Sequence, residues 1–150
     1  MTTPLDLLNA VADTLREIAN DEKFIAQYQE SRKLNIFVQS VPTNEFQSEQ
    51  FYPLLAVELI SIEDEVTDSV ASVLLTLGTY KGERSDGWRD HLNLLEMVRQ
   101  CILTHEIIGK RFPLQFPVYL GVVEPSSENF MFSNIFLQYR IGKPAKDYCR

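Results

Sequence analysis

The residues best suited to chemistry in this chain are a cysteine and a histidine on one predicted helix. Cys101 and His105 lie four residues apart, a spacing that places a thiol and an imidazole on the same helix face. Such a pair is half of a tetrahedral zinc site, which needs two further ligands. The other histidine, His91, lies more than three turns earlier, and Cys149 is next to the last residue, so only carboxylates remain to complete a site. The spacing favours a structural pair, and we expect no metal and no cofactor.

A second group of candidate ligands is the acidic run between two predicted strands, which contains Glu63, Asp64, Glu65 and Asp68. Carboxylates suit hard cations such as Ca²⁺ or Mg²⁺. A dedicated calcium loop repeats Asp at alternate positions and then places a Gly, and that pattern is absent. A solvated hairpin turn is therefore the favoured interpretation, and the turn is a candidate contact with a neighbouring protein.

Three glycines, Gly78, Gly82 and Gly87, separate a predicted strand from a predicted helix, as glycines do in phosphate-binding loops. Lys81 precedes Gly82 instead of following the last glycine, and no G-x-G-x-x-G is present. A G-x-S-x-G nucleophile motif is also missing, and the two histidines leave little scope for a nucleophile paired with a base. The sequence therefore predicts a protein that is not an enzyme and has no catalytic residues.

The length of 150 residues predicts one domain, large enough to bury a core without disulfides. The formal net charge of −7 argues against a general binder of nucleic acids or anionic membranes. Two cysteines are too few for a disulfide framework, which favours reduced thiols in a cytoplasmic setting. Because neither a signal peptide nor an apolar run of membrane-spanning length is visible, we expect a soluble protein without membrane contacts.

Hydrophobic periodicity gives the expected elements. They are a helix over 4–19, a possible short helix after Asp21, a strand over 34–40, a strand after Pro53, a strand over 69–80, a helix from 88 that stops near Gly109, and strands over 113–123 and 130–141. The short acidic link between the second and third strands predicts an antiparallel hairpin. Pro113 and Pro117 lack the N–H of a central ladder and place the fourth strand at an edge.

The order helix, three strands, helix, two strands predicts an α+β fold: a mixed, mainly antiparallel sheet of about five strands with two main helices. We expect a single domain over residues 1–150, with a mobile tail at 142–150. In the third strand, Val73, Leu75 and Leu77 should share the buried face. The predicted apolar stripe of the long helix contains Trp88, Leu92, Leu95, Val98 and Ile102.

Aromatic residues exceed what one small core requires, and they form two groups. Phe46, Phe51 and Tyr52 fall in or beside a polar loop that we expect to be exposed. The last strand is apolar on both faces, because Met131, Ile135, Leu137 and Ile141 alternate with Phe130, Phe132 and Phe136. Protein interfaces are enriched in aromatic side chains. Both groups are therefore candidate contacts with another subunit or with a partner.

The segment LLTLGTYKGERSDGWRDHLNLLEMVRQCILTHEIIGKRFPLQFP resembles the tail terminator, or tail completion, proteins of long-tailed bacteriophages and prophages. Members combine a strand ending in a small residue and Tyr, an acidic glycine turn, and a helix of the type G-[YW]-x-D-x-L-N-L-x-E-x-[VI]-R. The corresponding residues here are Gly78-Thr79-Tyr80, Asp86-Gly87-Trp88, Asp90, Leu92-Asn93-Leu94, Glu96 and Val98-Arg99, followed by Phe112, Leu114 and Pro117. The resemblance extends over about residues 54 to 141.

This resemblance implies a structural protein of the virion tail or neck, assembled in the host cytoplasm. Subunits of the family form a six-fold ring that caps the completed tail tube, stops its polymerisation and offers a docking face to the head. The implied partners are further copies of the chain, the tail tube protein and the head connector or neck protein. We also expect DNA to pass through the lumen without specific binding, because an acidic protein repels phosphates.

Two alternatives remain open from the sequence. One is a neck or head–tail joining protein, which belongs to the same structural class. The other is a small-ligand-binding or enzymatic α+β domain, which should hold a deep cavity with convergent polar residues of shifted pKa. The tail terminator and neck protein interpretations instead require flat contact patches with apolar centres.

Overall fold

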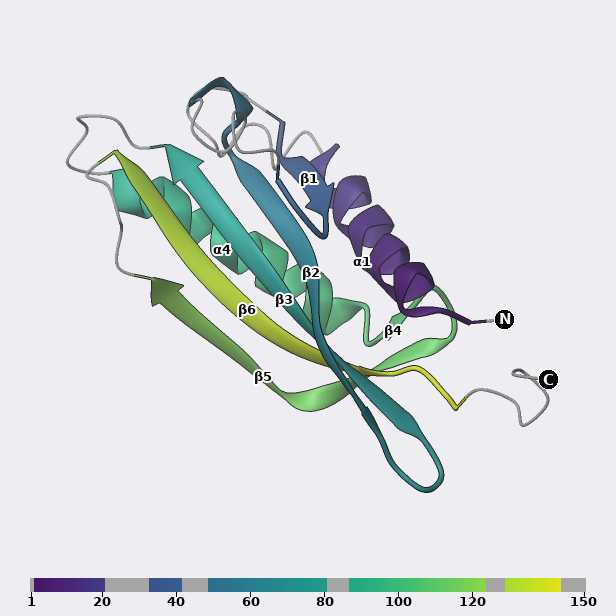
Figure 1. Ribbon diagram of the computed structural model, residues 1–150. Helices are drawn as coiled ribbons and strands as arrows, with labels where there is room; N and C mark the ends of the chain where they lie inside the picture. The colour runs from purple at the N-terminus through teal and green to yellow at the C-terminus, as the bar shows by residue number, and fades with distance from the viewer. Residues whose placement is uncertain (1, 21–32, 42–48, 81–86, 124–128, 144–150) are drawn as a thin grey trace.

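The computed structural model describes residues 2–20, 33–41, 49–80, 87–123 and 129–143 (Figure 1). Its helices are α1 (Pro4–Ala19), α4 (Gly87–Thr104) and the short 3₁₀ helix η1 (Glu49–Phe51). Its strands are β1 (Asn35–Val38), β2 (Leu54–Asp64), β3 (Ser69–Tyr80), β4 (Ile107–Ile108), β5 (Phe112–Val123) and β6 (Phe130–Arg140). Several predicted features lie outside the described residues: the short helix after Asp21, the loop with Phe46 and most of the tail.

The strands form one sheet in the order β1-β2-β3-β6-β5-β4 (Figure 1). β1 is parallel to β2, and every other described pair is antiparallel, including the predicted β2–β3 hairpin. The α+β class and the mainly antiparallel sheet are therefore confirmed. The expected five strands become six, because α4 ends at Thr104 and residues 107–108 form the short strand β4. Gly109 supplies the positive φ of the turn from β4 to β5.

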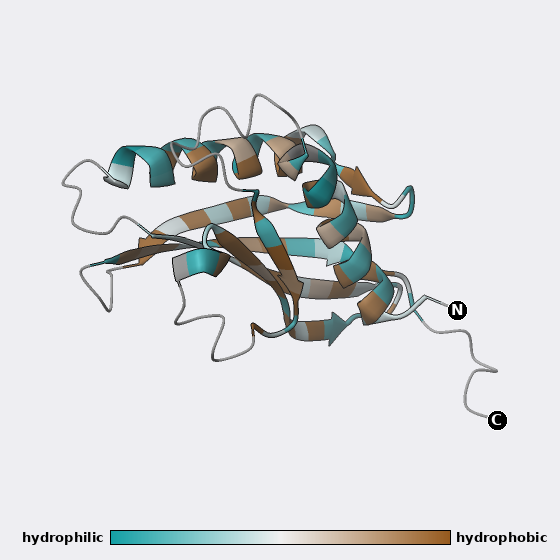
Figure 2. Ribbon diagram, turned by 90° about the horizontal axis from the view of Figure 1, so that it is seen from above, coloured by the Kyte–Doolittle hydropathy of each residue, from teal (hydrophilic) through white to brown (hydrophobic). Residues whose placement is uncertain are grey.

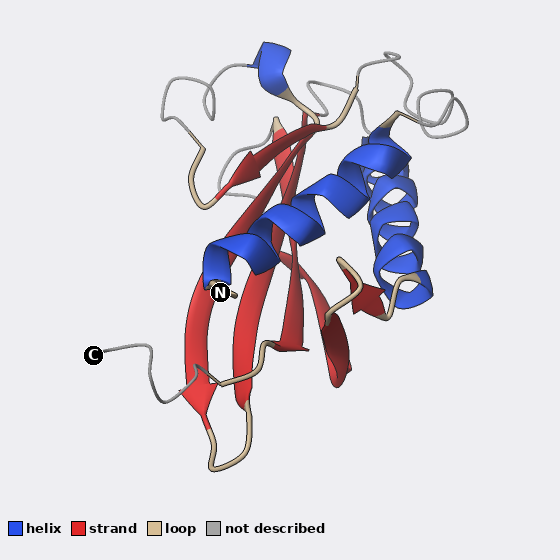
Figure 3. Cartoon of the chain, turned by 90° about the vertical axis from the view of Figure 1, so that its right-hand side faces the viewer, coloured by secondary structure: helices blue, strands red, loops and turns tan. Residues whose placement is uncertain are grey.

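Both long helices cover the same face of the sheet, which we call the helix face (Figures 2 and 3). α1 begins where the sequence predicts, because the Asp6 amide donates to Thr3 Oγ1 at 3.2 Å and the Thr3 amide donates to Asp6 Oδ2 at 2.8 Å. Val73, Leu75 and Leu77 are fully buried beneath the helices, as their alternation predicts. The other side of the sheet carries no long helix among the described residues, and we call it the open face.

The predicted stripe of α4 is rotated relative to the structure. Trp88 and Leu92 are 47% and 41% exposed, whereas His91 is completely buried beside Leu94 and Leu95. Leu95, Val98 and Ile102 are buried as predicted. The prediction was wrong at Trp88 and Leu92, because it ranked residues by hydrophobicity alone. A histidine can enter the core when its ring nitrogens find hydrogen-bonding partners, and His91 has two.

β4 is the end strand of the sheet and pairs with β5 at Phe112 and Pro113, so the edge prediction is wrong at Pro113. Beyond this short pair, β5 has no described strand on its outer side. Its apolar alternation is interrupted at Phe116. The register with β6 shifts between Gln115 and Tyr119, which leaves Phe116 61% exposed while Leu114 stays buried. A bulge of this kind bends an edge strand and re-aims its side chains.

Candidate interaction surfaces

The open face of the sheet has an apolar row across three strands. Pairing in the sheet places Leu74 opposite Phe136 and Phe136 opposite Tyr119, so their side chains lie side by side. The rings of Tyr119 and Phe136 are 6.4 Å apart, and the two side chains are 65% and 42% exposed. Phe136 therefore lies on the surface of this chain, as its predicted contact role requires.

The neighbouring aromatics of β6 lie in a small second core on the same open face. Phe132 is only 9% exposed and packs with Leu54 and Tyr52, whose ring centre is 6.3 Å away. Phe130 is half-buried, with its ring 4.7 Å from Tyr52 and 5.3 Å from that of Tyr80. Two of the three predicted contact residues of β6 are thus largely occupied within the chain.

Tyr52 is 1% exposed, so the expectation of an exposed aromatic at this position is wrong. Its burial raises the pKa of the phenol to about 12. Phe51 is half-buried at the end of η1, and its carbonyl accepts a hydrogen bond of 2.8 Å from Asn35 Nδ2. Phe51 and Tyr52 therefore help to hold the segment before β2 against β1. Phe46 lies outside the described residues.

The acidic turn between β2 and β3 is built as a hairpin turn. Ser69 Oγ donates to Asp64 Oδ1 at 2.6 Å, and Arg140 Nε lies 2.9 Å from Asp68 Oδ2. The side chains of Glu63 and Glu65 are exposed. The structure describes no group of three or more metal-ligating side chains among the residues it places. Asp64 and Asp68 thus shape the turn, and the two glutamates are free to meet a partner.

A buried polar network joins α4 to the centre of the sheet, and the sequence reasoning missed it. His91 Nδ1 lies 2.7 Å from Thr79 Oγ1, and His91 Nε2 lies 2.6 Å from Ser133 Oγ. All three side chains are buried. A neutral imidazole has one donor and one acceptor nitrogen, so one hydroxyl donates to the ring and the other accepts from it. Desolvation lowers the pKa of His91 to about 4 and keeps it neutral.

This network could have been suspected from spacing, because His91 lies three, four and seven residues before Leu94, Leu95 and Val98. Those positions share one helix face. No sequence pattern identifies Thr79 and Ser133 as its partners, since both come from distant strands. Full burial denies the three side chains any access to substrate, so the network holds α4 on the sheet.

Cys101 and His105 are neighbours, as predicted. The Cys101 sulfur is 3.9 Å from His105 Nδ1, which lies 2.9 Å from the Cys101 carbonyl oxygen at the end of α4. Burial and the nearby Glu17 raise the pKa of the Cys101 thiol to about 11. A buried, protonated thiol is a poor nucleophile. The pair is best explained by a structural role, in which His105 lies against a backbone carbonyl in the last turn of α4.

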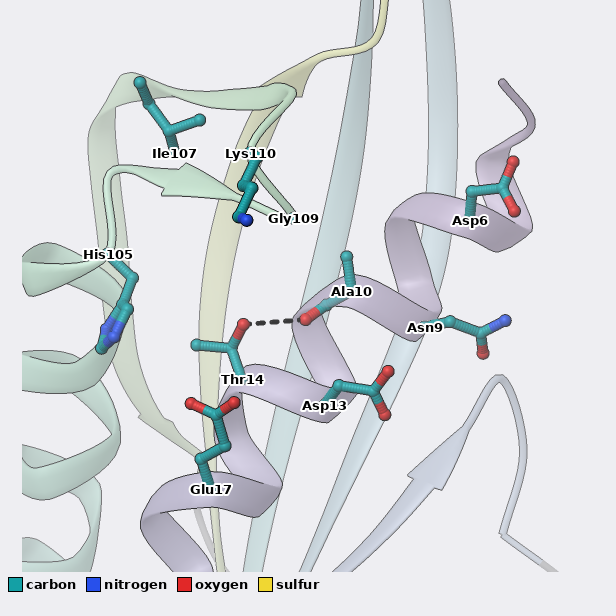
Figure 4. Close-up of a pocket in the computed structure, with 10 residues that line it drawn as sticks. All are labelled: Asp6, Asn9, Ala10, Asp13, Thr14, Glu17, His105, Ile107, Gly109 and Lys110. Carbon is teal, nitrogen blue, oxygen red and sulfur yellow. Dashed lines mark hydrogen bonds between the residues drawn. The ribbon is translucent and has the colours of Figure 1, made fainter. Parts of the chain in front are cut away.

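A shallow pocket of about 500 Å³ lies between α1 and the turn that carries β4 (Figure 4). Asp6, Asp13 and Glu17 line it from α1, and His105 and Lys110 line it from the segment that follows α4. Hydrogen bonds from Thr3 lower the pKa of the Asp6 carboxyl. Those bonds cap the helix, so the change has a structural cause. No helix that the structure describes is long and apolar enough to span a membrane.

Comparison with known proteins places the fold. The chain is similar to a chain of the solved structure described as "Virion of native gene transfer agent (GTA) particle". The two superpose with a TM-score of 0.52 and 14% sequence identity, over 91% of this chain and 95% of that chain. At this identity the likeness shows a shared fold that covers nearly the whole of both chains. Neither a protein-family model nor a curated protein sequence matches the chain.

Proposed function

We propose that this protein is a structural component of a phage-like virion, and specifically a tail terminator. The observation that carries the broader proposal is the shared fold, which covers 95% of a chain from a gene transfer agent virion. Coverage of this extent means that the likeness concerns a whole folded unit and is not confined to one motif. The narrower role rests on the residues between the end of β3 and the start of β5 that resemble tail terminators.

In this role, copies of the chain assemble into a hexameric ring on the end of the completed tail tube. The ring stops further polymerisation of the tube and presents a docking face to the head connector or neck protein. A cyclic ring needs two different contact surfaces on each subunit, because its contacts run head to tail. The exposed row with Phe136 and Tyr119 and the acidic β2–β3 turn are two such surfaces on separate parts of the chain.

The protein acts without catalysis in this proposal. His91 is buried between two hydroxyls, the Cys101 thiol is buried with a raised pKa, and the acids of the shallow pocket lie on one helix. A small-ligand or enzyme site would instead gather polar groups of shifted pKa in a deep cavity. The described residues offer the flat, partly apolar surfaces of an assembly protein.

Duplex DNA would pass through the lumen of the ring without specific contacts. The net charge of −7 per chain supports this part of the proposal, since excess carboxylates repel phosphates. Binding of DNA fragments by the assembled ring at low salt, measured by fluorescence anisotropy, should be undetectable. Strong binding that weakens steeply with added salt would indicate a lumen lined by Lys and Arg.

A capping experiment tests the proposed role. Purified tail tubes of the same particle are mixed with the protein and imaged by negative stain, with tubes alone as the control. We expect added density at one end of each tube and an arrest of elongation by tube protein. A protein that instead binds isolated head connectors and ignores tube ends would be a neck protein, and the terminator role would be wrong.

A further inference from the structure

The outer half of β5 is a sheet edge without a partner strand among the described residues. No described strand pairs with the outer side of residues 118–123, because β4 reaches only Phe112 and Pro113. The segment VYLGVV contains neither proline nor charge. Proteins usually block exposed edges with prolines, charges or bulges, and β5 has such devices only in its first half. Residues 118–123 therefore offer free backbone donors and acceptors beside apolar side chains.

Exposed apolar side chains flank this edge on both faces. Tyr119 and Val123 lie on the open face, and Val122 lies on the helix face, with exposed fractions of 65%, 39% and 55%. On α4, Trp88 and Leu92 are one turn apart and share a flank. We call residues 118–123 together with Trp88 and Leu92 the β5 border.

The position of α4 shows that this flank belongs to the same side of the molecule as β5. Cys101 lies on the opposite flank of the helix and is close enough to Glu17 of α1 for that carboxylate to raise its pKa. α1 packs on the β1 and β2 side of the sheet and also contacts the short strand β4 (Figure 1). The flank with Trp88 and Leu92 therefore faces away from α1, toward the β5 end of the sheet. Exposed apolar side chains grouped on a helix flank and on a strand edge are typical of interaction sites.

A second free edge lies on the other side of the sheet. β1 pairs only with residues 54–57, and no described strand pairs with the outer side of residues 60–64 (Figure 1). This half of β2 carries Ile60 and Ile62, which are 50% and 39% exposed, and leads to Val66, which is 93% exposed. We call residues 60–64 the β2 border. The two borders lie on opposite sides of the sheet and are of similar length.

We propose that the β5 border of one subunit accepts the β2 border of a neighbouring copy as an added strand. This inference rests on the proposed ring, in which each contact joins two different surfaces. Backbone hydrogen bonds would extend the sheet from subunit to subunit, while Ile60 and Ile62 cover apolar side chains of the β5 border. The faces of the two borders match, because the register places Ile62 of the β2 border and Val122 of the β5 border on the helix face of the sheet.

Pairing of two β5 borders with each other is the competing arrangement. It is isologous, so it closes at two subunits and leaves the β2 border uncovered. Two lysine substitutions distinguish these arrangements. Val122→Lys should disable only the β5 border, and Ile62→Lys should disable only the β2 border. Both side chains are exposed in the single chain, so thermal unfolding of each variant should remain close to that of wild type.

The test measures mass by light scattering on a size-exclusion column, over a range of concentrations up to the solubility limit. Wild type should assemble, and each variant alone should stay monomeric. An equimolar mixture of the variants should form dimers but nothing larger, because it contains one intact pair of borders. Leu5→Lys, at an exposed position of α1 that belongs to neither border, is the matched control and should assemble as wild type does.

Hydrogen exchange supplies a readout specific to strand pairing. Amides of residues 60–64 and 118–123 should gain protection on assembly, with no comparable gain along the exposed side of α1. The inference is overturned if wild type remains monomeric, if both variants still assemble, or if only Val122→Lys prevents assembly. A ring that forms despite both substitutions would refute the border pairing and leave the terminator role standing. Assembly into open filaments through these borders would support the border pairing and refute the terminator role.

Discussion

Acid should weaken this fold through His91 before it protonates most carboxylates. The imidazole is fully buried, and desolvation lowers its pKa from 6.5 to about 4. The unfolded chain therefore binds this proton more tightly than the folded chain does. The stabilising contribution is complete above pH 6.5 and is lost progressively as the pH falls toward 4. Since a tenfold change in proton affinity is worth about 1.4 kcal/mol, the loss amounts to about 3 kcal/mol.

A loss of about 3 kcal/mol is a large part of the 5–15 kcal/mol, roughly, that stabilises a typical domain. The assay is urea unfolding at a series of pH values between 7 and 4, at protein concentrations low enough to keep the chain monomeric. The variant His91→Gln retains a donor and an acceptor but cannot titrate. We expect it to be less stable than wild type at pH 7, with the difference shrinking by about 3 kcal/mol by pH 4.

The matched control is His105→Gln, which removes a histidine at an exposed position just after α4. It separates the effect of burial from the effect of losing any histidine, because the carboxylates titrate in all three proteins. A free-energy difference between wild type and His91→Gln that stays constant from pH 7 to pH 4 would refute the reasoning. It would mean that water or a rearranged hydrogen bond solvates the protonated ring in the folded state.

Three further substitutions test other parts of the account. The hydroxyl of Tyr139 is buried and has no hydrogen-bond partner among the described residues. Tyr139→Phe should therefore leave the free energy of unfolding unchanged or raise it by up to about 1 kcal/mol. A clearly lower free energy of unfolding in urea would reveal a hidden partner. A methyl group on Gly78 would lie 2.9 Å from the rings of both Phe132 and Tyr52. Gly78→Ala should therefore lower the free energy of unfolding by about 1–3 kcal/mol. An unchanged melting temperature would show that the second core is loosely packed. Phe46→Ala should leave the monomer's melting temperature unchanged and weaken assembly measured by light scattering; a melting temperature lower by several degrees would place Phe46 in the core.

Elements with a strong local pattern were predictable from the sequence. Thr3 and Pro4 mark the start of α1, and the alternation of Val73, Leu75 and Leu77 identifies the buried face of β3. Pro117 lies in the part of β5 that has no described outer partner, whereas Pro113 is paired with Ile107 of β4. Each signal is contained within a few consecutive residues, so no knowledge of distant partners was needed.

The features that failed depend on contacts between distant segments. Tyr52 is buried because Phe132, eighty positions later, packs against it, and His91 is buried because Thr79 and Ser133 solvate its ring. A pattern within a single element cannot reveal such partners. Trp88 was expected to be buried because it is large and apolar. It is exposed instead, and it belongs to the β5 border. The acidic turn and Phe136 remain predicted contacts.

The most direct test of the central claim is the mass of the wild-type assembly, measured by light scattering and paired with negative-stain images of the same fraction. The account predicts a closed hexameric ring whose lumen admits duplex DNA, alone or on the end of a tail tube. A protein that remains monomeric at its solubility limit and leaves tube ends bare would contradict it.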